Sequence, residues 1–261
     1  MHFDLNLEDI NIHFYKESFC PQKPTIIFLH DSFGCTTLWR DFPSKLAAAT
    51  ECNILIYDRQ GYGKSDRMEK VERSIDYLEK EAIFLNKIIQ KIDLQYVILF
   101  GHSDGGSIAL LAAAKYPERI KGVITEGAHV FVEDITRKGI KNSIPGYEKG
   151  MLKSRLQKYH GNKADDVFYS WSNTWLSKEY ASWNIEHFLP LIGCPVFVIQ
   201  GENDEFGSIA QVYKIIIKVS GISEAFIVPS AAHSPHKECP EMIISAVENF
   251  IKNRVLFSLP L

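Results

Sequence analysis

The segment 101–106, with the sequence GHSDGG, contains the residue that most strongly indicates chemistry, Ser103. The apolar run 96–100 precedes this segment and the helix-forming run 107–114 follows it, so a G-x-S-x-G motif lies between a predicted strand and a predicted helix. That context is typical of a sharp, strained turn, in which a base reaches the serine hydroxyl from one side and a carbonyl group reaches it from the other. We therefore expect Ser103 to be a nucleophile.

A serine nucleophile needs a base, and the base needs a carboxylate that orients it. Both residue types follow Ser103 at the ends of predicted strands. The buried-strand pattern 195–201 is followed by Asp204, and the short strand pattern 224–229 is followed by a loop that carries His233. We predict Asp204 to be the acid and His233 to be the base.

Other residues compete for these two roles. His236 lies three residues beyond His233 in the same loop and is the alternative base, although a supporting or helix-capping role also fits its position. Glu126 ends the strand pattern 123–125 and is the alternative acid, because a carboxylate one strand earlier sometimes reaches the same histidine. His102 occupies the variable position of the motif, and we interpret it as a packing residue.

The negative oxygen of a tetrahedral intermediate needs backbone N–H donors. The geometry of the motif supplies one from Asp104, the residue after the serine. The second is expected from the turn-rich segment 30–34 (HDSFG), which follows the strand pattern 25–29. Ser32 is the predicted donor in that segment, and Phe33 is the alternative.

These segments resemble the α/β-hydrolase fold superfamily over a stretch from about 25 to 250. The motifs that carry the resemblance are HDSFG (30–34), DRQGYGKS (58–65), GHSDGG (101–106), GEND (201–204) and HSPH (233–236). The resemblance implies an α/β-hydrolase fold with a serine nucleophile. The family usually has glycine where this chain has Asp31, so the early loop is expected to be less pliant.

One branch of the superfamily is of particular interest. Segment 103–106, followed by 112–117 (AAAKYP), is similar to the valacyclovir-hydrolase-like amino-acid ester hydrolases, and uncharacterised bacterial hydrolases resemble it at least as closely. This likeness implies that the Asp104 carboxylate pairs with a substrate ammonium group. The plainer interpretation is that Asp104 hydrogen-bonds neighbouring loop amides and only shapes the turn.

Strand and helix patterns alternate along most of the chain, which predicts a mostly parallel sheet covered by helices on both faces. The expected elements are an opening hairpin (3–7 and 10–15), strands 25–29, 54–57, 96–100, 195–201 and 224–229, and helices 74–91, 107–114 and 209–219. The interval 131–189 breaks the alternation. We predict it to be a helical cap, with helices at 148–159, 164–172 and 177–188, inserted into a hydrolase core formed by 1–130 and 190–261.

Three of the four tryptophans lie in this interval, namely Trp171, Trp175 and Trp183. Each one by itself is explained by packing between cap and core. Together they favour an aromatic-lined, water-poor pocket above the serine. The predicted substrate contacts are Asp104, Phe33, Trp171 and Trp175.

Composition restricts the classes of partner. The chain has 261 residues, 46% of them hydrophobic, which suits a single compact α/β unit. Its formal net charge of −3 offers no basic surface for nucleic acid, and no apolar run approaches the length of a membrane span. Without a leader pattern, we expect a cytoplasmic protein that contacts no membrane. Five cysteines without a C-x-x-C pair predict reduced thiols and no metal site. No cofactor is expected, and the sequence leaves the oligomeric state unknown.

These assignments predict a carboxylesterase-like serine hydrolase that transfers the acyl group of a small ester or amide substrate to water in two steps. Serine at position 103 argues against haloalkane dehalogenase and epoxide hydrolase chemistry, where relatives in this fold use aspartate. Carbon–carbon bond hydrolase and cofactor-free lyase activity stay open. A small-molecule receptor on the same scaffold, with slow turnover, is the alternative of a different class.

Overall fold

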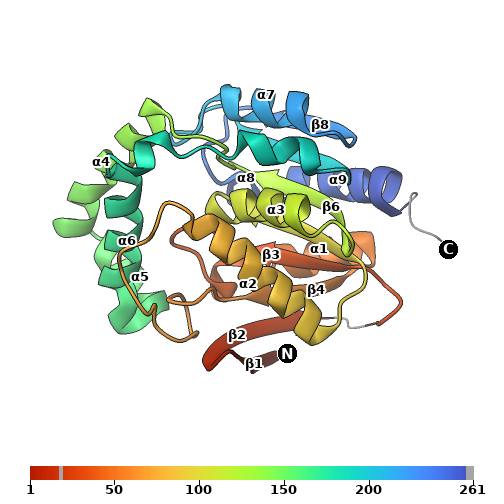
Figure 1. The fold of residues 1–261 in the computed structure, drawn as a ribbon, viewed down its shortest axis with the longest axis horizontal. Helices are drawn as coiled ribbons and strands as arrows, with labels where there is room; N and C mark the ends of the chain where they lie inside the picture. The colour runs from red at the N-terminus through yellow and green to blue at the C-terminus, as the bar shows by residue number, and fades with distance from the viewer. Residues whose placement is uncertain (18–19, 257–261) are drawn as a thin grey trace.

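The computed structural model describes residues 1–17 and 20–256, and an eight-stranded sheet forms its centre (Figure 1). The order of the strands in the sheet is β1-β2-β4-β3-β5-β6-β7-β8. The strands are β1 (His2–Leu7), β2 (Ile10–Glu17), β3 (Thr25–Leu29), β4 (Asn53–Tyr57), β5 (Val97–His102), β6 (Ile120–Glu126), β7 (Val196–Gly201) and β8 (Ser223–Val228). The pairs β1–β2 and β2–β4 are antiparallel, and all other pairs are parallel.

Helices surround this sheet. They are α1 (Phe42–Thr50), α2 (Tyr77–Ile92), α3 (Asp104–Lys115), α4 (Asp134–Glu148), α5 (Leu152–His160), α6 (Ala164–Leu176), α7 (Ile209–Lys218), α8 (Pro235–Glu238) and α9 (Pro240–Phe250). Shorter 3₁₀ turns span η1 (Thr36–Trp39), η2 (Gly161–Lys163), η3 (Tyr180–Ser182) and η4 (Glu186–Leu191), and a π-helical turn, η5, spans Ile251–Val255. No helix in the described part of the chain is both long and apolar enough to cross a membrane.

The central strands are apolar on both sides because helices cover both faces of the sheet. In β3, Ile27 and Leu29 belong to the apolar cluster that includes α2 and α3, while Ile26 and Phe28 belong to the cluster that includes α1 and α9. Strand β5 alternates in the same way. The predicted architecture, a mostly parallel sheet covered by helices on both faces, is therefore confirmed.

The segment between β6 and β7 is helical, and in Figure 1 its helices α4, α5 and α6 gather at one end of the sheet. Its buried side chains, such as Ile140 and Phe168, join the same apolar cluster as α2 and α3. The division into a core (1–130 and 190–261) and a cap (131–189) therefore stays a prediction, and the last five residues of that core lie outside the described part of the chain.

Two of the predicted cap helices are wrong in their bounds. The predicted helix 148–159 crosses a break between α4 and α5, and the predicted helix 177–188 is replaced by the turns η3 and η4. Helix α4 was not predicted, because Gly139 and Pro145 disfavour a helix interior. The structure explains Gly139: a Cβ there would lie 2.8 Å from the backbone oxygen of Glu205, so glycine lets α4 approach the loop after β7.

Candidate active site

Ser103 lies in the turn between β5 and α3, with φ 56° and ψ −119°. A non-glycine residue in this region of backbone space is strained by about 1–3 kcal/mol, so the surrounding structure must impose the turn. Two flanking glycines make it possible. A Cβ on Gly101 would lie 2.1 Å from the Gly105 backbone oxygen, and a Cβ on Gly105 would lie 2.0 Å from the Leu29 backbone oxygen. The turn therefore packs directly against the end of β3.

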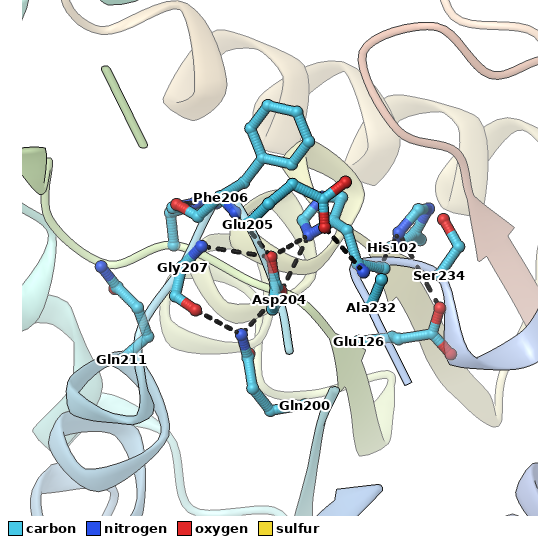
Figure 2. Close-up of polar contacts among 12 residues, drawn as sticks. His102, Glu126, Gln200, Asp204, Glu205, Phe206, Gly207, Gln211, Ala232 and Ser234 are labelled. Atoms are coloured by element: carbon cyan, nitrogen blue, oxygen red, sulfur yellow. Dashed lines mark hydrogen bonds and ion pairs between the residues drawn. The ribbon is translucent and has the colours of Figure 1, made fainter. Parts of the chain in front are cut away.

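Asp204, in the loop after β7, and His233, in the loop after β8, form a close pair. His233 Nδ1 lies 2.9 Å from both carboxylate oxygens of Asp204. The carboxylate is held from behind as well. Its Oδ1 accepts hydrogen bonds from the Phe206 and Gly207 amides (2.8 and 3.2 Å), and its Oδ2 accepts one from Gln200 Nε2 (2.6 Å; Figure 2). The orientation of Asp204 is thus determined before any substrate binds.

Burial lowers the pKa of His233, but the hydrogen bond and the charge of Asp204 outweigh it, so the pKa lies above the ordinary value of 6.5. Burial raises the pKa of Asp204, and contact with His233 reverses this, so that carboxyl titrates below its usual range. Both shifts favour an ion pair when His233 takes up a proton. With Nδ1–H directed at Asp204, the lone pair of the neutral ring lies on Nε2, as a general base requires.

Ser103 and His233 line the same cavity. No hydrogen bond joins the two side chains among the described residues, and catalytic contacts of this kind often tighten only when substrate binds. The structure therefore brings the three residues predicted for the triad to one site, and their catalytic roles stay a prediction.

Two backbone N–H groups of the early loop, those of Phe33 and Gly34, are hydrogen-bonded within the loop itself. Asp31 Oδ1 accepts a hydrogen bond from the Phe33 amide (3.0 Å), so that amide is not free to bind an oxyanion. The amides of Ser32 and Asp104 have no acceptor in the described part of the chain, and their role in holding an oxyanion stays a prediction. Asp31, where the family usually has glycine, thus bends the loop through its own side chain.

The cavity has a volume of about 60 Å³. Its lining residues are Asp31, Ser32, Phe33, Ser103, Asp104, His129, Thr136, Ile140, Trp171, Trp175, Phe206 and His233. Phe33 packs edge-on against Trp171 at 4.6 Å between ring centroids, which joins the early loop to α6. All four predicted substrate contacts lie in this wall. Trp183 does not, and it stacks on Tyr180 instead.

Comparison with known proteins identifies the family of this chain. A family model described as alpha/beta hydrolase fold matches residues 24–166, more than half of the chain. The chain belongs to the alpha/beta hydrolase fold family. It is similar to the mouse (Mus musculus) protein "Serine hydrolase BPHL", with 28% identity over 208 residues that cover 76% of this chain and 69% of the relative. It is also similar to a "Putative esterase/lipase" of Haemophilus influenzae, with 26% identity over 266 residues that cover 93% of this chain and 88% of the relative.

Among solved structures, the alpha/beta hydrolase MGS-M2 from a Medee basin deep-sea metagenome library superposes with a TM-score of 0.78 and 17% identity, covering 99% of both chains. At that identity the likeness shows the fold alone. The family and the named relatives together establish that the chain is a hydrolase enzyme.

Asp104 is surrounded by partners that the sequence did not reveal. Its Oδ2 accepts a hydrogen bond from Tyr77 (3.2 Å) and lies 3.7 Å from Arg59 Nη2 and 3.8 Å from Arg73 Nη1. Trp175 Nε1 in turn donates to the Tyr77 hydroxyl. One oxygen of the carboxylate is therefore anchored by two guanidinium groups, while Oδ1 has no hydrogen bond within the described residues.

The alternative acid and the alternative base pair with each other. His236 Nδ1 lies 2.5 Å from Glu126 Oε1, and the His236 amide donates to Glu126 Oε2 (3.1 Å). Neither residue lines the cavity. These two and His102 are the one group in the described chain whose spacing suits a metal ion, but His236 already occupies both Glu126 oxygens, so hydrogen bonding accounts for the arrangement.

Apart from Asp31, four lining residues were not among the site residues predicted from the sequence, namely His129, Thr136, Ile140 and Phe206. The Phe206 carbonyl accepts hydrogen bonds from His129 Nε2 (3.0 Å) and from Thr136 Oγ1 (2.5 Å). Burial lowers the pKa of His129, and its bond to a carbonyl assigns the proton to Nε2. Of these four residues, only Phe206 has a sequence signal, since it lies two residues after Asp204.

Proposed function

We propose that this protein is a serine hydrolase that cleaves a small ester or amide through an acyl-enzyme intermediate. Ser103 Oγ attacks the carbonyl carbon, and its proton passes to His233 Nε2. The imidazolium gives that proton to the leaving alcohol or amine as the bond to the acyl group breaks. Water then repeats the sequence: His233 takes a proton from the attacking water, the acid is released, and Ser103 regains its proton.

The observation that carries the proposal is that His233, which is paired with Asp204, lines the same cavity as the strained Ser103. Asp204 stabilises the imidazolium that forms during each step, as the raised pKa of His233 reflects. The free amides of Ser32 and Asp104 are suited to hold the oxyanion, because neither N–H has another acceptor in the described chain.

The walls of the cavity support a short apolar acyl group. Ile140, Trp171 and Phe206 contribute apolar surface, and the volume of about 60 Å³ is well below the several hundred Å³ of a typical drug-sized ligand site. We therefore propose acetyl- to butyryl-sized acyl groups as the preferred substrates.

Asp104 adds a polar element to this subsite. Its Oδ1 has no hydrogen bond among the described residues, and Asp104 lines the cavity, so an α-ammonium group on the acyl part has an oxygen to pair with. The two guanidinium groups near Oδ2 partly neutralise the carboxylate, which limits the gain from such a pair. We propose a preference for amino-acid esters of about tenfold, the scale of one charge-assisted hydrogen bond.

The test is turnover of p-nitrophenyl acetate by the purified protein and by Ser103→Ala, His233→Ala and His236→Ala. Ser103→Ala and His233→Ala are expected to lower kcat/KM by about a thousandfold or more, because the members of a triad act as a unit. His236→Ala serves as the matched histidine control and is expected to keep most of the activity per folded molecule. Near-normal turnover by His233→Ala would overturn the assignment of the base, and wild-type protein that binds esters tightly without turnover would indicate a receptor.

A further inference from the structure

His102 lies beside the catalytic candidates without lining the cavity. Its ring is buried, and its Nε2 lies 2.8 Å from the backbone oxygen of His233. Because a carbonyl oxygen only accepts, Nε2 must donate this hydrogen bond. The side chain next to the serine therefore holds the main chain of the proposed base.

The other nitrogen of the same ring faces the early loop. His102 Nδ1 lies 3.3 Å from Asp31 Oδ2, and the other oxygen of Asp31 accepts the Phe33 amide. Burial opposes ionisation of Asp31, but Lys237 and His102 hold its pKa well below the usual range. One imidazole thus lies between the loop of the proposed oxyanion donor and the loop of the proposed base.

The remaining side of the ring is closed by the Glu126–His236 pair. Glu126 Oε1 lies 3.8 Å from His102 Nε2, and the ring of His236 packs edge-on at 5.1 Å between centroids. The ring of His233 lies 5.0 Å away on a tilted plane. Figure 2 shows His102 and Glu126 to the right of Asp204 and Gln200. With packing on these sides, the His102 ring has little freedom to turn.

We propose that His102 is a positioning residue for the hydrolysis, which holds the backbone of His233 so that Nε2 of that base meets Ser103. The inference rests on the proposed role of His233. The hydrogen bond from His102 fixes the carbonyl of His233, while Asp204 fixes the far side of its ring, so the two contacts together determine where Nε2 points. A misplacement of about 1 Å at a reacting group costs about a hundredfold in rate.

A matched pair of substitutions isolates this contact. The amide nitrogen of glutamine lies close to the position of histidine Nε2, and that of asparagine lies close to the position of Nδ1. His102→Gln is therefore expected to keep the bond to His233 and to retain kcat for p-nitrophenyl acetate within about threefold of wild type. His102→Asn is expected to lower kcat by about 10- to 100-fold, with KM changed by less than about threefold.

The same substitutions at His13 provide the control, because that histidine is also buried and hydrogen-bonded but lies on β2, with its ring paired to Asp4. His13→Gln and His13→Asn should leave kcat unchanged. Rates are expressed per folded molecule, measured by circular dichroism and by the thermal unfolding midpoint. If His102→Asn does not fold, NMR of ¹⁵N-histidine-labelled wild type replaces it, with the His102 signal assigned by its loss in His102→Gln.

In that experiment the inference expects a slowly exchanging proton on Nε2 of His102. Wild-type kcat in His102→Asn, equal losses in both His102 variants, or an unprotonated Nε2 would each overturn it. If His233→Ala itself retains activity, the proposed function fails instead, so the two failures are distinguishable.

Discussion

Replacing Asp204 by asparagine perturbs the proposed triad at its most constrained point. In the native site, Oδ1 of Asp204 accepts hydrogen bonds from two backbone amides, and Oδ2 accepts one from Gln200 Nε2. His233 Nδ1 lies 2.9 Å from both oxygens. An asparagine that keeps its oxygen toward the Phe206 and Gly207 amides must direct its NH₂ group at Gln200 and His233. The NH₂ group then donates to His233 Nδ1, which moves the ring proton to Nε2, and a protonated Nε2 cannot accept the proton of Ser103.

The size of the effect follows from the charge that is lost. Two charges about 4 Å apart interact by about 4 kcal/mol at an effective dielectric of about 20, and about 1.4 kcal/mol corresponds to one pKa unit. Loss of the Asp204 charge therefore lowers the pKa of His233 by up to about three units. Burial, which lowers this pKa in the native protein, remains, so the pKa in Asp204→Asn is expected to fall below 6.5. We expect kcat/KM to fall by about a thousandfold or more.

The assay is the pH dependence of kcat/KM for p-nitrophenyl acetate between about pH 5 and pH 9. Wild-type activity requires neutral His233, so it is lost as the pH falls through a pKa above 6.5. In Asp204→Asn the residual activity should persist to lower pH. Glu126→Gln is the control, because Glu126 pairs with His236, and it should leave the acidic limb in place. An unchanged limb in Asp204→Asn, or a shift in Glu126→Gln alone, would refute the reasoning.

Two further predictions concern the acyl subsite. Trp171→Leu should raise the ratio of kcat/KM for p-nitrophenyl octanoate to kcat/KM for the acetate by about tenfold, since about two more buried CH₂ groups contribute about 1.6 kcal/mol. Trp183 lies outside the cavity wall, so Trp183→Leu should leave this ratio unchanged. Equal ratios in the two variants would contradict the proposed wall. Asp104→Asn should abolish the preference of about tenfold for an amino-acid benzyl ester over its des-amino analogue, and should lower the thermal unfolding midpoint because Arg59 and Arg73 lose their carboxylate. Equal losses on both esters would leave Asp104 a structural role only.

The parts of the site that could be predicted from the sequence are those with a local signal. The turn at Ser103 follows from glycines within a few residues, and Asp204 and His233 follow predicted strands whose carboxyl ends meet at one edge of a parallel sheet. In the structure Ser103 and His233 line one cavity, and Asp204 contacts His233 from outside that cavity wall.

Contacts between distant segments had no such signal. The pairing of Asp104 with Arg59 and Arg73 brings the segment after β4 to the first residue of α3, and no periodicity in the sequence indicates this contact. The place of His102 at the variable position of the motif predicts only a packing role, and its bond to the His233 carbonyl, which spans 131 positions of the chain, has no local signal.

The helical segment between β6 and β7 was the least predictable part of the chain. Gly139 and Pro145 lower helix propensity, yet α4 forms because its buried face packs into the apolar cluster, where tertiary packing outweighs local preference. Segment 177–188 shows the opposite error. It contains residues compatible with a helix, but an isolated bridge between Phe131 and Asn184 pairs its middle with the segment that joins β6 to α4.

The central claim, that Ser103 is a nucleophile activated by His233, is tested most directly by covalent labelling. A fluorophosphonate probe is incubated with wild type, Ser103→Ala and His233→Ala, and the modified residue is located by peptide mass spectrometry. The account predicts a single label on Ser103 in wild type, no label in Ser103→Ala and labelling slowed by about a hundredfold or more in His233→Ala. A label on another residue, or wild-type labelling in His233→Ala, would contradict it.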